Sequence, residues 1–395
     1  MHIAIFIDLH PMSLGGMQTS VRLQRKFLAR IGVETTVFAP KSANALPDDD
    51  TVILPSQRIS PSGEYSGVWD LEDALEVARA EFEKTKFDVI HLQGDFAAAA
   101  LALALSREYN IPLIHHAHTN IDVVLERLIG KRLNARLFNY AAGKYCEVAG
   151  IPRQMAKNGW EYMEITYPNA DLVMAPSTHF AKTIEEHGIA KNVTVMLNGV
   201  DDDAIGHIKR QNEVPNKPIR FIWAGRFLRE KRLLQTIRAF KKANLNAELV
   251  IYGTGPLETP AKSLVRTLRI GHKVSFHGRV DRDAMLQAFA NSDVVLQTSI
   301  GFETQGMTVF EAAAFGTPAL CCDARVAGEL KPGHWWVTRD DSIEGLANAM
   351  VEAYQDIEAG KSKRVDNEDN SWLLQSKLTE RMHRIYLDQI AKKAQ

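Results

Sequence analysis

Short apolar segments alternate with longer helix-periodic segments along almost the entire chain. Each apolar segment is rich in Val and Ile and hydrophobic on both faces, as parallel strands covered by helices must be. Alternation on this scale predicts βαβ units and doubly wound parallel sheets. The expected strands are residues 2–8, 34–39, 88–93, 112–118, 171–177 and 193–198 in a first series, and 219–225, 248–253, 273–278, 293–299 and 317–322 in a second.

A polar segment separates the two series. Residues 201–218 read DDDAIGHIKRQNEVPNKP, a charged and proline-containing stretch typical of an interdomain linker. A chain of 395 residues is also long for a single hydrophobic core. We therefore expect an α/β protein with two Rossmann-like, doubly wound domains that face a central cleft. The expected parts are a first domain (1–205), a linker (206–217), a second domain (218–370) and a final helix (371–395) whose apolar side could pack back on the first domain.

Charge, targeting and metal signals exclude several classes of protein. The 47 basic and 48 acidic residues leave no basic excess for nucleic-acid phosphates. The apolar start MHIAIFIDLHPMS lacks a basic leader and reads as a strand, and no apolar run approaches the roughly 18 residues that span a bilayer. Three cysteines are too few for a zinc site, and the acidic triplets Asp48–Asp50 and Asp201–Asp203 lie in polar segments. We expect a cytoplasmic protein without metal or other cofactor.

Two loops that follow expected strands are candidates for binding anions. The segment AGRFLREKRL supplies Arg226, which can fork onto phosphate oxygens, and Lys231, which adds a mobile positive charge. A solvated basic helix start is the alternative. The Gly15–Gly16 pair follows the first strand, where glycine lets the backbone approach a ligand and helical N–H groups favour anions. In open α/β sheets, ligands bind at such loops.

The segment SIGFETQGMTVFEAAAFGTP carries two glutamates, Glu303 and Glu311, with seven residues between them. A helix is expected to begin near Met307 and to end at Gly316 and Pro318. One carboxylate could bind sugar hydroxyls and the other a ribose, while the backbone between them holds phosphate. This arrangement suits a nucleotide-sugar; paired helix-cap glutamates are the alternative. The backbone and side chains expected to take part belong to Gln305, Gly306, Met307 and Thr308.

The combination of GRFLREK with Glu303 and Glu311 in ETQGMTVFEAAAFGTP resembles the retaining family 4 glycosyltransferases of GT-B fold. The segments DVIHLQ, HAHT, ADLVMAPS and LNGVD extend the resemblance through the first half of the chain. It implies that the second domain binds the nucleotide-sugar and the first binds the acceptor. By motif, Arg226 and Lys231 would bind the diphosphate, Glu303 the sugar, Glu311 the ribose and Gly16 the β-phosphate. His118 matches the active-site histidine of the family, with His116 a second candidate on the acceptor side.

One departure from the common family pattern points to the acceptor. Many members have Glu-Gly-Phe-Gly where this chain has Glu303-Thr304-Gln305-Gly306, a form that resembles bacterial enzymes that glycosylate diacylglycerol. This resemblance implies UDP-glucose as donor and a membrane lipid as acceptor. The alternatives are a soluble or polysaccharide acceptor and a non-catalytic nucleotide-sugar-binding protein. A nicotinamide-dependent oxidoreductase is disfavoured, because no G-x-G-x-x-G follows the first strand.

A basic amphipathic helix is expected over residues 124–145. Its apolar stripe is flanked by positive charges, and such helices can lie on anionic membranes. Ordinary packing on its own domain is the alternative. Membrane contact would make the protein peripheral on the inner face of the cell membrane. The basic residues expected at this surface are Arg127, Lys131, Arg132 and Arg136.

Overall fold

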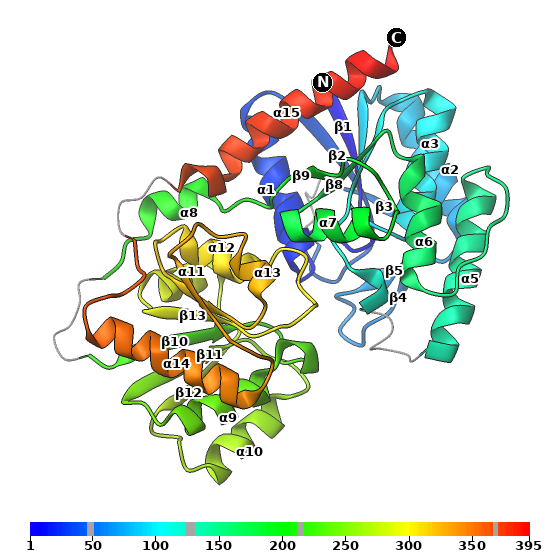
Figure 1. Ribbon diagram of the computed structural model, residues 1–395. Helices are drawn as coiled ribbons and strands as arrows, with labels where there is room; N and C mark the ends of the chain where they lie inside the picture. Colours follow the sequence, from blue (N-terminus) through cyan, green and yellow to red (C-terminus); the bar gives the residue numbers. More distant parts are fainter. Residues whose placement is uncertain (46–50, 124–130, 212–216, 366–369) are drawn as a thin grey trace. The chain divides into compact units, whose positions relative to one another are not determined.

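A computed structural model describes residues 1–45, 51–123, 131–211, 217–365 and 370–395, with the backbone alone described for 131–134. The chain forms two compact units. The first contains Met1–Gly199 together with Gln375–Gln395, and the second contains Val200–Leu374. Each unit has its own parallel sheet flanked by helices (Figure 1). The expected α/β class with doubly wound parallel sheets is therefore confirmed.

The first unit has a seven-stranded parallel sheet with the strand order β3-β2-β1-β6-β7-β8-β9. Its strands are β1 (His2–Phe6), β2 (Glu34–Pro40), β3 (Thr51–Leu54), β6 (Val89–Leu92), β7 (Leu113–His116), β8 (Leu172–Ala175) and β9 (Thr194–Val195). Its helices are α1 (Gly16–Arg30), α2 (Leu71–Lys84), α3 (Ala97–Tyr109), α5 (Lys131–Val148), α6 (Gly159–Thr166), η1 (Tyr167–Asn169), α7 (Thr178–Glu186) and α15 (Gln375–Lys393). A small antiparallel hairpin joins β4 (Gln57–Arg58) to β5 (Ser66–Gly67).

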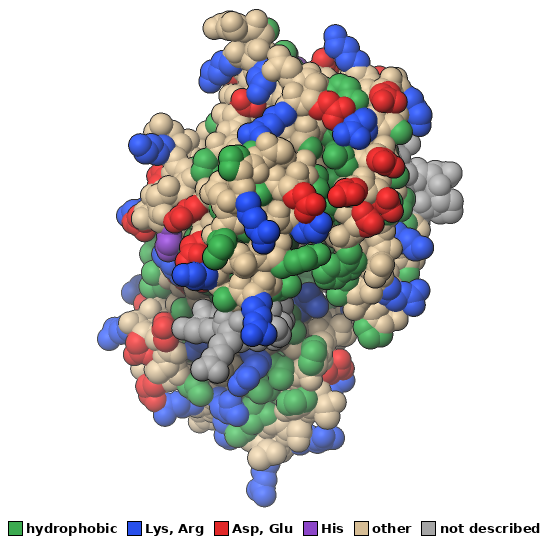
Figure 2. Space-filling view, turned by 90° about the vertical axis from the view of Figure 1, so that its right-hand side faces the viewer, with side chains coloured by type: hydrophobic (Ala, Val, Ile, Leu, Met, Phe, Trp, Pro, Cys, Tyr) green, Lys and Arg blue, Asp and Glu red, His purple; other side chains and the backbone are tan. Residues whose placement is uncertain are grey.

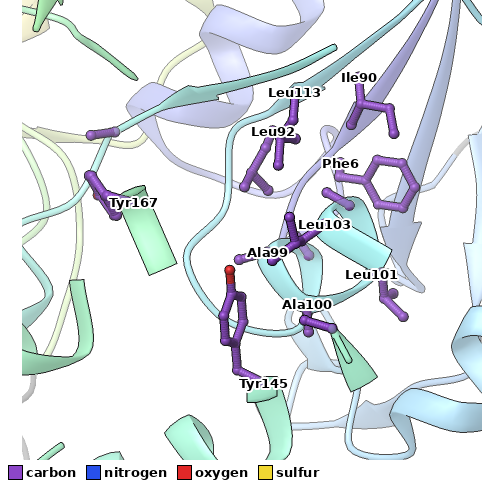
Figure 3. Packing of buried hydrophobic residues seen from close by; sticks show 14 of the residues in the cluster. Phe6, Ile90, Leu92, Ala99, Ala100, Leu101, Leu103, Leu113, Tyr145 and Tyr167 are labelled. Carbon is purple, nitrogen blue, oxygen red and sulfur yellow. The ribbon is translucent and has the colours of Figure 1, made fainter. Parts of the chain in front are cut away.

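The two faces of this sheet are covered by different helices. Successive residues of a strand point to opposite faces, so β1 sends Ala4 and Phe6 into one core and Ile3 and Ile5 into another. The first core includes the alanine-rich helix α3, whose small side chains permit close packing on the sheet (Figure 3). The second core includes residues of α1 and α15. Burial of strands on both faces explains why they read as continuous apolar runs.

The last helix of the chain packs on the first unit. Leu378, Met382 and Tyr386 of α15 are buried with Ile3 and Ile5 of the sheet. At its end, Nζ of Lys393 donates hydrogen bonds to the Asp171 carboxylate at 3.0 Å. The apolar spacing in the sequence thus corresponds to a buried face of α15.

The second unit has a six-stranded parallel sheet with the order β12-β11-β10-β13-β14-β15. Its strands are β10 (Ile219–Ala224), β11 (Ala247–Tyr252), β12 (Val274–Gly278), β13 (Val294–Gln297), β14 (Ala319–Cys321) and β15 (Trp335–Val337). Its helices are α8 (Asp202–His207), η2 (Arg229–Lys231), α9 (Leu233–Ala243), α10 (Glu258–Thr267), α11 (Arg282–Ala290), α12 (Met307–Ala313), α13 (Ala324–Ala327), α14 (Ile343–Glu358) and η3 (Ser371–Leu373).

The boundary between the units lies earlier than the expected linker at 206–217. Asp201 caps α8 by accepting a hydrogen bond from the Asp203 N–H at 3.1 Å. Ala204 and Ile208 are buried in the core of the second unit. The charged surroundings of these two apolar residues concealed a short helix in a segment that reads as linker. No helix in the described ranges is both long enough and apolar enough to cross a membrane.

Candidate active-site residues in the two units

Each sheet has one place where the chain order reverses, between β1 and β6 in the first unit and between β10 and β13 in the second. Ligands of open α/β sheets bind outside the carboxyl ends of the strands at such switch points. After β1 come Gly15 and Gly16, the latter as the first residue of α1. After β10 come Arg226 and, in the short helix η2, Lys231, and after β13 comes Glu303. The candidate residues therefore lie in the loops where each fold binds ligands.

An ion pair joins two of the candidates in the second unit. Nζ of Lys231 lies 2.5 Å from Oε1 of Glu303, and the two side chains are 23% and 13% exposed. The same ammonium group lies 4.9 Å from the ring centroid of Phe302. Because both side chains are partly buried, water and salt weaken the attraction of this ion pair less than that of a surface pair. The loops after β10 and β13 thus bring a cation and a carboxylate together.

A buried hydroxyl fixes the backbone that carries Lys231. Thr298, directly after β13, donates a hydrogen bond of 2.7 Å from Oγ1 to the carbonyl of Lys231. The Thr298 oxygen in turn accepts a 2.9 Å hydrogen bond from Nε1 of Trp223 in β10. The next residue, Arg232, has a left-handed φ of 58°. The sequence interpretation missed Thr298 and Trp223, because both read as ordinary strand residues.

Arg226 is exposed in the loop after β10, and a neighbouring loop supports its backbone. The Phe227 N–H donates to the Thr254 carbonyl at 2.9 Å. Gly253 has a φ of 118°, and a Cβ there would lie 1.9 Å from the Gly225 carbonyl oxygen. The glycine therefore permits the two loops to touch.

Gly306 is the N-cap of α12 and has a left-handed conformation that favours glycine. Its φ is 85°, and an added Cβ would lie 3.1 Å from Val326 and 3.2 Å from Gln297. The preceding Gln305 is buried, and Met307 and Thr308 form the first helical turn. No side chain caps this helix, so the helix-cap interpretation of the two glutamates is wrong.

Glu311 lies within α12, and its side chain is 15% exposed. Its Oε1 lies 3.2 Å from a terminal nitrogen of Arg282 in α11. Burial raises the pKa of the Glu311 carboxyl above its ordinary value, while the charge of Arg282 opposes this shift. A carboxylate held with little solvent is a strong hydrogen-bond acceptor for hydroxyl groups.

In the first unit, the glycine loop is held by the β4–β5 hairpin. Oε1 of Glu64 accepts a hydrogen bond from the Leu14 N–H at 2.9 Å, and the Tyr65 hydroxyl donates to the Leu14 carbonyl at 3.1 Å. Both backbone polar groups of the residue before Gly15 are therefore engaged. Gly16 is the first residue of α1. The hairpin has no strong sequence signal, and its two residues were missed.

The two candidate histidines occupy different environments. His116 is 1% exposed, and its Nε2 donates to the Met196 carbonyl at 3.0 Å. Burial lowers the pKa of His116 to about 3, so this ring is a neutral core residue. Its role on the acceptor side stays a prediction. His118 is less buried, and its Nε2 donates to Oε1 of Gln93 at 3.0 Å. Burial, with smaller effects of nearby imidazoles, lowers the pKa of His118 well below its ordinary range.

Helix α5 has both a buried and an exposed face. Phe138 and Tyr145 are buried in the first unit, whereas Leu137 and Tyr140 are 39% and 58% exposed. Arg136 is exposed beside them. Figure 2 shows one face of the molecule, on which Lys and Arg side chains lie among hydrophobic and acidic ones. Arg127 and the side chains of Lys131 and Arg132 lie outside the described residues.

The acidic triplets and the cysteines are the sequence features that could suggest a metal site. Asp201 is the helix cap already noted, and Asp48–Asp50 lie outside the described residues. The three cysteines are free and buried. Within the described part of the chain, no group of three or more His, Cys, Asp or Glu side chains could hold a metal ion.

Two protein families match this chain. Residues 14–204 match the family described as Glycosyltransferase Family 4, and residues 204–368 match the family described as Glycosyl transferases group 1. The alpha-monoglucosyldiacylglycerol synthase of Streptococcus pneumoniae is 22% identical over 340 residues, which cover 81% of this chain and 70% of that protein. The D-inositol 3-phosphate glycosyltransferase of an Arthrobacter species is 25% identical over 355 residues, covering 82% and 79%.

A solved structure has the same fold. Anabaena HepE in complex with UDP superposes with a TM-score of 0.71 and 15% identity, covering 98% of this chain and 99% of that one. Together with the family matches, two parallel-sheet units of this kind identify a glycosyltransferase of GT-B fold. The chain belongs to glycosyltransferase family 4, since the two family matches together span residues 14–368. It resembles the diacylglycerol glucosyltransferases, as the sequence motifs predicted.

Proposed function

We propose that this glycosyltransferase transfers glucose from UDP-glucose to a hydroxyl group of a membrane lipid such as diacylglycerol, with retention of configuration at the sugar. The observation that carries the proposal is the Lys231–Glu303 ion pair at the switch point of the second sheet. A cation and a carboxylate in contact suit a ligand that combines a diphosphate with sugar hydroxyls. The UDP bound to HepE and the name of the streptococcal relative support the donor and the acceptor, respectively.

Donor binding is assigned to the second unit. Arg226 and Lys231 bind the diphosphate, and the N–H groups near Gly306 add hydrogen bonds to its oxygens. Glu303 accepts hydrogen bonds from the sugar, and Glu311 accepts them from the ribose. Negative charge develops on the diphosphate as it leaves, so cations and N–H dipoles already in position lower the barrier. In this proposal Arg226 and Lys231 balance the diphosphate charge, and chelators do not reduce turnover.

The proposed transfer occurs on one face of the sugar. The bond between C1 and the diphosphate oxygen breaks while the acceptor oxygen forms its bond to the same face of C1. The acceptor hydroxyl proton passes to an oxygen of the leaving diphosphate, so no protein nucleophile is required. His118 contacts the donor sugar and orients it. The products are UDP and an α-linked glucoside.

Lipid as acceptor is supported by the exposed side of α5. Leu137 and Tyr140 offer apolar surface, and Arg136 offers positive charge next to it. Apolar residues can enter the interfacial region of a bilayer while basic residues bind anionic headgroups. The protein would then work at the cytoplasmic face of the membrane without spanning it.

Nucleotide release from a panel of donors tests this proposal. UDP-glucose, UDP-galactose, UDP-N-acetylglucosamine and GDP-mannose are each supplied with anionic vesicles that contain or lack diacylglycerol. The proposal predicts release from UDP-glucose that increases strongly when diacylglycerol is present. UDP release that does not change when diacylglycerol is added would favour a soluble acceptor, such as the D-inositol 3-phosphate in the name of the Arthrobacter relative. No release from any donor would contradict the enzymatic proposal.

A further inference from the structure

A chain of buried polar side chains runs from α1 to His118 inside the first unit. Ser20, Gln24 and Gln93 are 0%, 4% and 0% exposed, and Asn198 is 5% exposed. Ser20 and Gln24 lie four residues apart in α1, on the side that packs against the sheet. Polar groups at such positions are costly to bury unless they are hydrogen-bonded. We call Ser20, Gln24 and Gln93 the glutamine relay.

The shorter hydrogen bonds of the relay all run from His118 towards Asn198. His118 Nε2 donates to Gln93 Oε1 at 3.0 Å, and Gln93 Nε2 donates to Gln24 Oε1 at 2.7 Å. Gln24 Nε2 then donates to Ser20 Oγ at 2.9 Å, and the Ser20 hydroxyl donates to Asn198 Oδ1 at 2.6 Å. A longer contact of 3.4 Å from Gln24 Nε2 to Gln93 Oε1 completes the amide pair. The orientation of the Gln93 amide is therefore set by Gln24, and that of the Gln24 amide by Ser20.

We infer that the glutamine relay is a positioning device for the transferase reaction, in which Gln93 holds His118 in the Nε2–H tautomer. A neutral imidazole has one N–H nitrogen and one acceptor nitrogen, and the partner of the first decides which is which. With Nε2 donating to Gln93, Nδ1 carries the lone pair that can accept a hydrogen bond from a sugar hydroxyl. This inference rests on the proposed contact between His118 and the donor sugar.

Packing alone does not require these residue types. Leucine or methionine at positions 24 and 93 could fill similar volume without any polar group to satisfy. A fully connected polar network instead specifies one arrangement of its members. Ser20 also lies one helical turn after Gly16, so the relay connects the helix of the glycine loop with His118. Asn198, at the other end of the network, lies next to the end of the first segment of the unit, Met1–Gly199.

The surroundings keep His118 neutral. The groups that lower the pKa of its imidazole, after burial itself, are His116 and His115 of β7 and His91 of β6. His91 in turn is hydrogen-bonded through Nδ1 to the Tyr386 hydroxyl of α15 at 2.8 Å. A neutral ring makes the choice of tautomer meaningful, because an imidazolium would carry a proton on both nitrogens.

Substitution of Gln93 tests the inference in the full-length protein. In Gln93→Leu we expect kcat with UDP-glucose at saturation to fall by about tenfold or more, because a misplaced catalytic contact commonly costs this much. Nitrogen-15 NMR of the wild-type protein should report Nε2–H for His118, and this signature should be lost in Gln93→Leu.

In Gln93→Glu the carboxylate keeps an acceptor oxygen and favours the imidazolium, so the acid limb of the profile of kcat against pH should move to higher pH. Ser20→Ala, which leaves Gln93 intact, should give a smaller loss of kcat.

Two comparisons separate a positioning role from a loss of stability. Ile184→Val shortens a buried side chain of α7 outside the relay and should leave kcat and the NMR signature unchanged. If Gln93→Leu does not fold, Ser20→Ala and the wild-type NMR spectrum decide the matter. The inference is overturned by an Nδ1–H signature in the wild type, or by wild-type kcat in the folded relay variants. Loss of turnover in His118→Ala with normal turnover in the relay variants would overturn the relay alone. Normal turnover in His118→Ala would overturn the proposed contact of His118 as well.

Discussion

Nζ of Lys231 and Oε1 of Glu303 lie 2.5 Å apart, although the two residues follow different strands, β10 and β13. The pair marks the place where the chain order of the second sheet reverses. Each member is held by a loop with a defined conformation, since Thr298 fixes the Lys231 backbone and Gly306 closes the Glu303 loop. The pair is thus available in a fixed position before any donor binds. Such preorganisation is what electrostatic catalysis requires.

Loss of either member of this pair should abolish most of the transfer activity. For Lys231→Met and Glu303→Gln we expect kcat to fall by about 100-fold or more, as when a preorganised charge partner of the transition state is removed. Arg226→Ala should have a similar effect. Circular dichroism should show the wild-type fold for each. Lys242→Met is the matched control, because Lys242 forms an ion pair of 2.5 Å with Glu344 in the same unit. The kcat of this variant should equal that of the wild type. Near-normal activity in the Lys231 and Glu303 variants would remove them from the site.

Glu311→Gln should separate nucleotide binding from stability. The proposed ribose contact predicts UDP affinity weaker by about tenfold or more, since a hydrogen bond to a charged group is lost. The folded-state pKa of Glu311 is raised, so its ionisation costs stability as pH rises from 4.5 through the raised value. The stability of the variant relative to wild type should therefore increase with pH over this window. Calorimetric titration with UDP and denaturant unfolding at several pH values measure both effects, and unchanged UDP affinity would contradict the ribose contact.

His116 should make the stability of the first unit depend on pH. Its pKa is about 3 in the folded protein, against 6.5 ordinarily, so the unfolded chain takes up a proton that the folded chain does not. The stabilising effect of folding with a neutral ring is complete above pH 6.5 and is lost as pH falls towards 3. The free energy of unfolding of the wild type, minus that of His116→Gln, should rise by about 1.4 kcal/mol per pH unit in this window. Equal pH slopes in urea unfolding of the two proteins would show that His116 is not buried as a neutral ring.

Membrane contact through α5 predicts a salt-dependent defect. In the double variant Arg136→Gln, Tyr140→Ser we expect weaker sedimentation with anionic vesicles and lower turnover on diacylglycerol in vesicles. Added salt should weaken wild-type binding, because the contact is partly electrostatic. Hydrolysis of UDP-glucose in the absence of lipid should stay as in the wild type. Lys182→Gln, a change of an exposed lysine on α7, serves as the control and should bind vesicles normally. Equal binding by all three proteins would argue against this surface.

The architecture was largely predictable because parallel strands buried on both faces leave long apolar runs. All eleven expected strands have a counterpart in the two sheets. The strands β3 and β15, each at a sheet edge, were missed, whereas the other two edge strands, β9 and β12, were expected. The boundary of the second unit was misplaced because the two buried apolar residues of its first helix, Ala204 and Ile208, are surrounded by charges. Patterns of hydrophobicity thus report central strands better than edges and short helices.

The candidate site was predictable only where a motif follows a strand. Lys231 and Glu303 could be identified individually, but their contact required the order of β10 and β13 in the sheet. His116 and His118 look alike in HHAHT, and only the fold distinguishes the core ring from the one that reaches Gln93. Ser20 and Gln24 did leave a signal, since both are polar at positions of α1 that share a side with Val21 and Leu28.

The most direct test of the central claim is the structure of the product formed by the purified protein. UDP-glucose and vesicles containing diacylglycerol are supplied, and the lipid product is examined by proton NMR at its anomeric position. The account predicts one new glucolipid with the α configuration, because the donor is α-linked and the configuration is retained. A β-linked product would contradict retention, and consumption of UDP-glucose with free glucose as the only sugar product would contradict a lipid acceptor.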